Sequence, residues 1–171
     1  RPATPATPAT PEPAATMTLR GRLELAAGTG QPVTPGEAAD GVVYFLPQGG
    51  SARPRPGRFT INTHSRGFSP GVRVVPVGST LSFPNNDTIL HNVFSRTPGS
   101  TFDLGLYGPG ETRNQVLSRP GLVIVNCNVH PQMRADVLVL ETPHFVRPSR
   151  DGRFELAQLP PGPGTLVFWH P

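Results

Sequence analysis

The chain has 171 residues, the length of one domain, and its 19 glycines and 23 prolines leave little room for long helices, because a proline inside a helix costs about 3 kcal/mol. The net charge of +4 comes from 15 basic residues, all of them arginine, against 11 acidic ones. The arginines are scattered, which argues against nucleic-acid binding and indicates a mild preference for acidic partners, and no apolar run approaches the ~18 residues of a membrane-spanning helix.

The first 16 residues repeat the pattern Pro-Ala-Thr. Such a segment is stiff and extended and lacks the side chains that build a core. We expect residues 1–16 to be a disordered linker, either a tether that holds a domain near a membrane or partner, or merely a disordered terminus. The chain starts at Arg1 without an apolar signal segment, so we expect a processed form whose location must be argued from its chemistry.

From Met17 onward, short alternating runs separated by Gly, Pro, Asn and Asp predict β-strands. The expected strands are 18–25, 41–46, 58–62, 72–76, 79–83, 90–95, 113–117, 121–126, 134–141, 152–157 and 164–169. Their spacing favours an all-β protein, either an antiparallel sandwich or a barrel. We expect one domain over 17–171, with a possible β-appendage at 146–171, and the similar composition of 17–46 suggests that the two ends pair with one another.

One window between two apolar strands carries the metal-binding chemistry: Cys-Asn-Val-His-Pro-Gln-Met (127–133). Its loop is short enough to bring Cys127, His130 and Met133 to one point, and His91 lies on an apolar strand upstream. Two histidines and a cysteine with a weak axial methionine form the ligand set of a type 1 (blue) copper site. A single cysteine excludes an intrachain disulfide, a Cys-only zinc site and a dinuclear copper centre with two thiolates.

Each of these residues alone has an ordinary explanation. A lone cysteine is usually a small buried hydrophobe, a methionine usually fills a core, and a histidine on an apolar strand is usually satisfied within the core. Their joint occurrence in one loop favours copper.

Two segments resemble the cupredoxins. Residues 127–139 resemble the short amicyanin-like copper loop, in which proline follows histidine, and Pro-Asn-Asn-Asp (84–87) with His-Asn-Val (91–93) resembles the strand of the first histidine ligand. The similarity extends over 18–170 and is greatest to periplasmic proteins often labelled "methylamine utilization protein". The further shared motifs are Phe-Asp-Leu-Gly-x-Tyr (102–107), Thr-Pro-x-Phe (142–145) and an Asp-Gly-x-Phe to Trp-His ending (151–170).

The resemblance implies a cupredoxin-like Greek-key β-sandwich with additional strands at both ends. It also implies copper bound by His91 Nδ1, Cys127 Sγ, His130 Nδ1 and a longer contact to Met133 Sδ. Asn92 is expected to hydrogen-bond across to the loop of Cys127.

Several neighbouring residues receive simpler expectations. Pro131 removes a backbone N–H beside His130, which shapes the potential and restrains the ring. Phe94 and Phe102 are expected in the core. The other histidines are not expected to bind metal: His64 and His144 in loops, and His170 stacking on or capping the last strand.

Function follows from what surrounds Cys127. Multicopper oxidases and copper nitrite reductases need histidine beside that cysteine, whereas Asn126 and Asn128 flank it here, and Met133 fills the open coordination position. We therefore expect no enzyme but a monomeric, periplasmic or extracytoplasmic one-electron carrier, whose electrons pass through His130 to redox partner proteins. A copper storage or delivery protein is the alternative, and a structural sandwich with a buried thiol is the third possibility.

Overall fold

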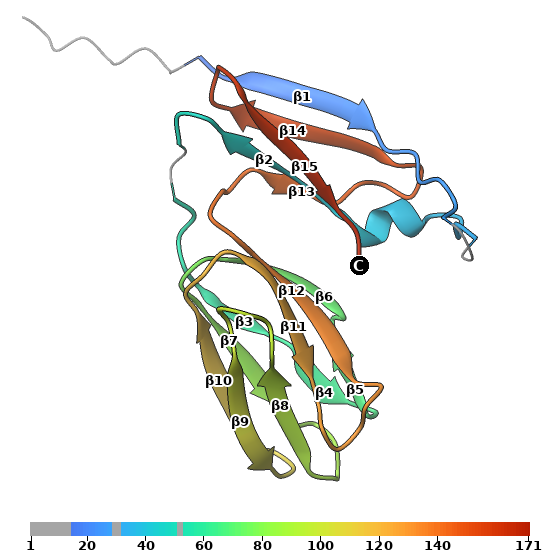
Figure 1. The fold of residues 1–171 in the computed structure, drawn as a ribbon, viewed down its shortest axis with the longest axis vertical. Coiled ribbons are helices and arrows are strands. Elements are labelled where there is room, and N and C mark those ends of the chain that lie inside the picture. The colour runs from blue at the N-terminus through green and yellow to red at the C-terminus, as the bar shows by residue number, and fades with distance from the viewer. Residues whose placement is uncertain (1–14, 29–31, 51–52) are drawn as a thin grey trace, which may run out of the picture.

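A computed structural model describes residues 15–28, 32–50 and 53–171 of the chain (Figure 1). Nearly all of the expected linker 1–16 lies outside these residues. The expectation of an all-β protein is confirmed, with one 3-10 helix, η1 (Glu37–Asp40), in the described part. No described helix has the length and apolar character required to cross a membrane.

The strands follow the expected order with a few additions. They are β1 (Met17–Arg22), β2 (Val42–Pro47), β3 (Arg58–Thr60), β4 (Asn62–His64), β5 (Gly67–Ser69), β6 (Val72–Pro76), β7 (Ser79–Pro84), β8 (His91–Ser95), β9 (Phe102–Tyr107), β10 (Thr112–Leu117), β11 (Gly121–Asn126), β12 (Arg134–Leu140), β13 (Phe145–Val146), β14 (Arg153–Leu159) and β15 (Gly164–Trp169). Strands β5, β9 and β13 were not predicted, and only the first residue of β4 fell within a predicted strand. Gly105, whose φ is 70°, and Asp103 interrupt β9 with residue types that strands disfavour.

The central body, called the sandwich here, comprises β3 to β12. Its five-stranded sheet has the order β6-β12-β11-β8-β9, and its three-stranded sheet has the order β10-β7-β3. The main core cluster includes Phe83, Val93, Val123 and Val137. Most strand pairs are antiparallel as expected, but β6 pairs with β12 in parallel, and so does β3 with β7, because the chain returns to these neighbours through long crossovers.

The two ends of the chain form a second unit, the terminal lobe, made of β1, β2, β13, β14 and β15. β1 pairs with β14, and the order β13-β2-β15 gives a second small sheet. A separate cluster around Val43, Phe45, Leu156 and Leu159 forms the core of this lobe. The expectation that the two ends pair with one another is confirmed.

A third apolar cluster joins the lobe to the sandwich. Val42, Tyr44 and Trp169 of the lobe meet Val74, Leu138 and Leu140 of the sandwich. This contact covers one face of β12 and the main core covers the other, so every residue of β12 after its first is buried. The lobe covers the outer side of β12 and β6, away from the end of the sandwich where β8 begins and β11 ends (Figure 1).

Candidate metal centre

Three adjacent strands bring the predicted ligands to one end of the sandwich. β11 lies between β8 and β12 and pairs with both. His91 is the first residue of β8, and Cys127 directly follows the last residue of β11. Met133 directly precedes β12, so His130 lies in the loop between β11 and β12. The backbone N–H of Met133 donates to the carbonyl oxygen of His130 over 3.0 Å and closes this loop.

The candidate ligand atoms converge. One atom each of His91, Cys127 and His130 lies within 4.8 Å of the others. Cys127 Sγ is 3.8 Å from His91 Nδ1, and the two imidazole rings are 5.0 Å apart between centroids. Met133 is buried in the same core cluster as Cys127. The structure thus brings together three of the four predicted ligands, His91, Cys127 and His130, and places Met133 in the core cluster that contains Cys127.

The ring nitrogens show which atoms are available to a metal. His91 Nε2 lies 2.8 Å from Asp87 Oδ2, which leaves Nδ1 facing Cys127. His130 Nδ1 is buried and has no hydrogen-bond partner among the described residues. Since a buried polar atom without a partner costs free energy, this nitrogen fits a metal ion. A thiolate with two imidazole nitrogens, near a thioether, suits copper in a type 1 site.

Only one of the two histidines reaches the surface. His91 is fully buried, whereas His130 is half-buried within a loop of exposed residues. Val129 and Leu90, which precede the two histidines in sequence, are 42% and 53% exposed. The end of the sandwich at His130 therefore offers apolar surface beside one candidate ligand.

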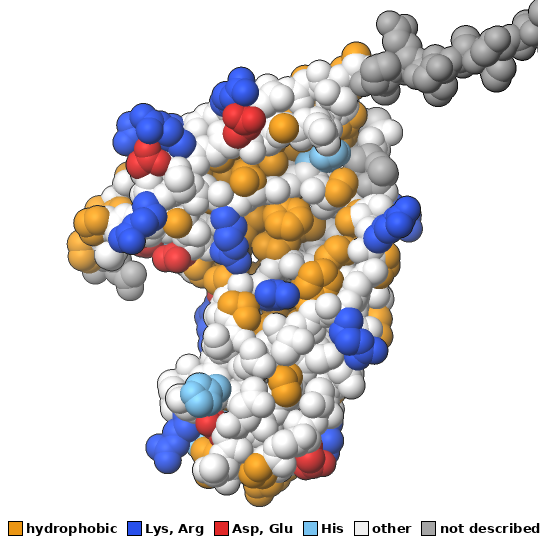
Figure 2. Space-filling model, turned by 180° about the vertical axis from the view of Figure 1, so that it is seen from behind, with side chains coloured by type: hydrophobic (Ala, Val, Ile, Leu, Met, Phe, Trp, Pro, Cys, Tyr) orange, Lys and Arg blue, Asp and Glu red, His pale blue; other side chains and the backbone are white. Residues whose placement is uncertain are grey.

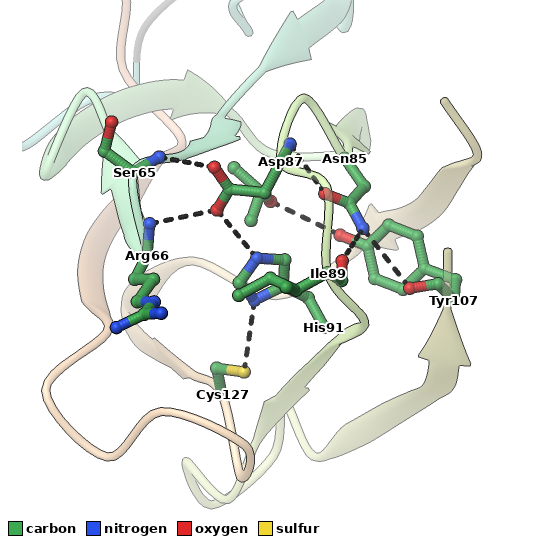
Figure 3. Close-up of polar contacts among 9 residues, drawn as sticks. Ser65, Arg66, Asn85, Asp87, Ile89, His91, Tyr107 and Cys127 are labelled. Atoms are coloured by element: carbon green, nitrogen blue, oxygen red, sulfur yellow. Dashed lines mark hydrogen bonds and ion pairs between the residues drawn. The ribbon is translucent and has the colours of Figure 1, made fainter. Parts of the chain in front are cut away.

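Asp87 is a contact residue that the sequence analysis did not assign. Its carboxylate accepts hydrogen bonds from His91 and from the backbone N–H groups of Ser65 and Arg66 (Figure 3). Burial alone would raise the pKa of Asp87, but the hydrogen bonds from the two backbone N–H groups and the imidazole outweigh it and lower that pKa. The motif 84–87 was recognised in the sequence. The contact of Asp87 with a turn 21 residues upstream could not be predicted, because it has no signature in the neighbouring residues.

The expectation for Asn92 is wrong. Its Nδ2 donates to Asp103 Oδ1 on β9 over 2.7 Å, rather than to the loop of Cys127. A carboxylate is a stronger acceptor than a neutral group, and β9 brings Asp103 to the irregular pairing around Asn92. Asn92 Oδ1 is buried without a partner among the described residues.

The remaining aromatic and histidine expectations hold in part. His144 lies in a loop, but His64 is the last residue of β4. The ring of His170 lies 6.1 Å from that of Phe168 between centroids. Phe102 packs against the core, whereas Phe94 is only half-buried and lies outside the core clusters, with the guanidinium of Arg96 over its ring.

Comparison with known proteins gives relatives of the expected kind. No family model matches the chain. The methylamine utilization protein MauL of Methylorubrum extorquens is 35% identical over 68 residues, which make up 39% of this chain and 59% of that protein. The chain thus spans less than two thirds of the length of this relative.

Solved structures of cupredoxins also match. A purple cupredoxin from Nitrosopumilus maritimus has 24% identity and a TM-score of 0.42, covering 47% of this chain and 98% of that one. An oxidised variant of amicyanin has 20% identity and a TM-score of 0.46, covering 49% and 83%. The chain is similar to cupredoxins.

An enzyme is also among the matches. A copper-containing nitrite reductase from Thermus scotoductus has 24% identity and a TM-score of 0.47, covering 66% of this chain and 28% of that one. Because all these TM-scores are below 0.5, the interpretation of the site depends on the residues of this chain.

Proposed function

We propose that the protein binds one copper ion in a type 1 site and carries single electrons between redox partner proteins. The ligands are His91 Nδ1, Cys127 Sγ, His130 Nδ1 and Met133 Sδ. The observation that carries the proposal is the buried His130 Nδ1, which has no hydrogen-bond partner within 15–28, 32–50 and 53–171 and lies next to a buried thiol and a second inward-facing Nδ1. The bound metal would supply the reversible one-electron couple, and no residue here is assigned to catalysis.

The surroundings of the four residues suit a carrier. The core around Cys127 and Met133 is packed, so the ligands have little freedom to rearrange when the charge of the site changes. His91 Nε2 is held by Asp87, and the loop of His130 is closed by its backbone hydrogen bond to Met133. A centre held in this way suits a metal that changes oxidation state without changing partners.

Electrons enter and leave through His130 in this proposal, because it is the one histidine of the pair that reaches the surface. Val129 and Leu90 supply apolar docking surface. Redox encounters typically bury less than about 1,200 Å², so a small patch of this kind is sufficient. Arginines are spread singly over the face shown in Figure 2, which with the net charge of +4 favours weak attraction to an acidic partner.

We also propose that the protein works as a monomer in the periplasm or another extracytoplasmic compartment, where residues 1–16 tether it near a membrane. None of these three points bears on the metal site itself.

The deciding experiment is to add Cu(II) to the metal-free protein and record visible absorption and electron paramagnetic resonance spectra. An intense thiolate-to-copper band with a narrow copper hyperfine splitting is expected, and His64→Asn serves as a matched histidine control that keeps both. Absence of the band in the wild type would overturn the copper site. A coloured protein that cycles poorly but passes copper to a metal-free acceptor would favour storage or delivery over electron transfer.

A further inference from the structure

The turn between β4 and β5 has an unusual backbone. Ser65 and Arg66 have φ values of 52° and 55°, in the left-handed region that residues with side chains rarely adopt. Two successive residues of this conformation form the tight hairpin connection that fits the twist of the strands, but glycine or asparagine normally occupies them. Something must therefore hold this turn in place.

The carboxylate of Asp87 holds it. Oδ1 accepts the N–H of Ser65 over 2.6 Å, and Oδ2 accepts the N–H of Arg66 over 2.9 Å. The same Oδ2 lies 2.8 Å from Nε2 of His91. One carboxylate thus joins a turn to a candidate metal ligand 25 residues further along the chain from that turn (Figure 3).

The position of Asp87 is itself fixed by hydrogen bonds through Asn85. Its backbone N–H donates to Asn85 Oδ1 over 3.0 Å, and Asn85 Nδ2 donates to the carbonyl oxygens of Ile89 and Tyr107. The side chain of Asp87 is only 12% exposed and that of His91 is not exposed at all. Both partners of the contact are therefore held in position before any metal binds.

We infer that Asp87 is a positioning residue that fixes the tautomer and ring orientation of His91, and that the N–H groups of the β4–β5 turn are part of the same arrangement. A neutral imidazole carries one N–H. A carboxylate at Nε2 keeps the hydrogen on that nitrogen and leaves the lone pair of Nδ1 directed at Cys127. The two turn N–H groups share the charge of the carboxylate and so limit how much of it reaches the ring.

This inference rests on the proposed function where it concerns copper, but its tautomer part requires no metal. A negative charge hydrogen-bonded to a ligand histidine stabilises Cu(II) more than Cu(I). Asp87→Asn should therefore raise the reduction potential and weaken Cu(II) binding, by about 10- to 100-fold for loss of such an outer partner. Cys127 is untouched, so the thiolate-to-copper band should remain.

The first measurement uses the metal-free wild type. Nitrogen-15 NMR of its neutral histidines should show His91 with hydrogen on Nε2, protected from exchange with water. Hydrogen on Nδ1 would overturn the inference whether or not any variant folds. In Asp87→Asn the same resonance should lose its exchange protection or move to a mixture of tautomers.

The second measurement compares potentials and Cu(II) affinities across three proteins. Asp103→Asn is the matched control, because Asp103, like Asp87, accepts hydrogen bonds from a side chain and from the backbone but does not contact a candidate ligand. It should leave both quantities near the wild-type values. Arg66→Gly keeps the turn N–H and relieves the strain of its backbone, so it should leave the His91 tautomer unchanged.

A blue wild type whose Asp87→Asn variant has the same tautomer, potential and affinity would refute the role of Asp87. A colourless wild type would refute the copper site instead, while the NMR result on His91 would still stand.

Discussion

The sandwich and the terminal lobe are both small β structures with their own apolar cores, yet they differ in what the cores contain. The core of the sandwich includes Cys127 and Met133 and lies against His91. The core of the lobe is purely apolar among its described residues. In the described chain, the one group of three metal-binding side chains lies at the end of the sandwich. The candidate metal ligands thus belong to the sandwich, and the pairing between the two ends of the chain belongs to the lobe. The two units meet at β12.

The sharpest way to test this division is to remove the thiol. Cys127→Ser should abolish the thiolate-to-copper absorption band completely, because no other sulfur of this kind exists in the chain. The substitution places a hydroxyl in a buried position, so the free energy of unfolding should fall by only about 1–3 kcal/mol. Visible absorption after addition of Cu(II), together with far-ultraviolet circular dichroism, measures both effects. A band that survives would mean that Cys127 is not the ligand.

The contact between the two units gives the next largest effect. Leu138 faces the terminal lobe, and its neighbour Val137 faces the core that holds the candidate ligands. Leu138→Ala should lower the free energy of unfolding by about 2–5 kcal/mol and leave the copper spectrum unchanged. Exposed Leu166 of the lobe is the control, since Leu166→Ala should cost less than about 0.5 kcal/mol. Denaturant unfolding measures the loss, and a changed copper spectrum in Leu138→Ala would show that the lobe influences the site.

The loop ligands could be predicted from the sequence because they are close together in it. Cys127, His130 and Met133 lie between two neighbouring strands, so their spacing alone predicts convergence. His91 could be added because two histidines, a cysteine and a methionine form the ligand set of a type 1 copper site, and because residues 84–87 and 91–93 resemble the cupredoxin strand of the first histidine ligand. The all-β character was readable for the same local reason, from alternation and turn residues.

Contacts between segments that are distant in sequence could not be predicted. The bond from Asp87 to the Ser65–Arg66 turn and the bond from Asn92 to Asp103 depend on which strands become neighbours. Periodicity says which face a side chain takes, not which strand lies beside it. For the same reason β12 could be recognised as a strongly apolar strand, while the lobe that covers its second face could not be foreseen.

Substitution of a glycine in the terminal lobe tests whether this unit can be destabilised without affecting copper binding. A Cβ added to Gly164 would lie 2.6 Å from the carbonyl oxygen of Leu46 on the paired strand β2. Gly164→Ala should therefore push β15 from β2 and lower the free energy of unfolding by about 1–3 kcal/mol. Copper binding should be unaffected. Gly49→Ala, with nothing within 4 Å of the added Cβ, is the control, and equal stability of the two variants would contradict the close approach.

The smallest expected effect concerns the rate of electron transfer at the exposed rim of the site. Gln132 is exposed and lies two residues from His130. Gln132→Glu places a negative charge where we propose an acidic partner docks, so the second-order rate constant should fall by several-fold at low salt while the copper spectrum is unchanged. Gln158→Glu makes the same change of charge at an exposed position of β14 in the terminal lobe and should have little effect. The difference between the two variants should shrink as ionic strength rises toward 0.15 M, where the screening length is about 8 Å. Stopped-flow kinetics with an acidic redox protein measure both rates, and a slower Gln158→Glu beside an unchanged Gln132→Glu would move the docking surface from His130 to the lobe.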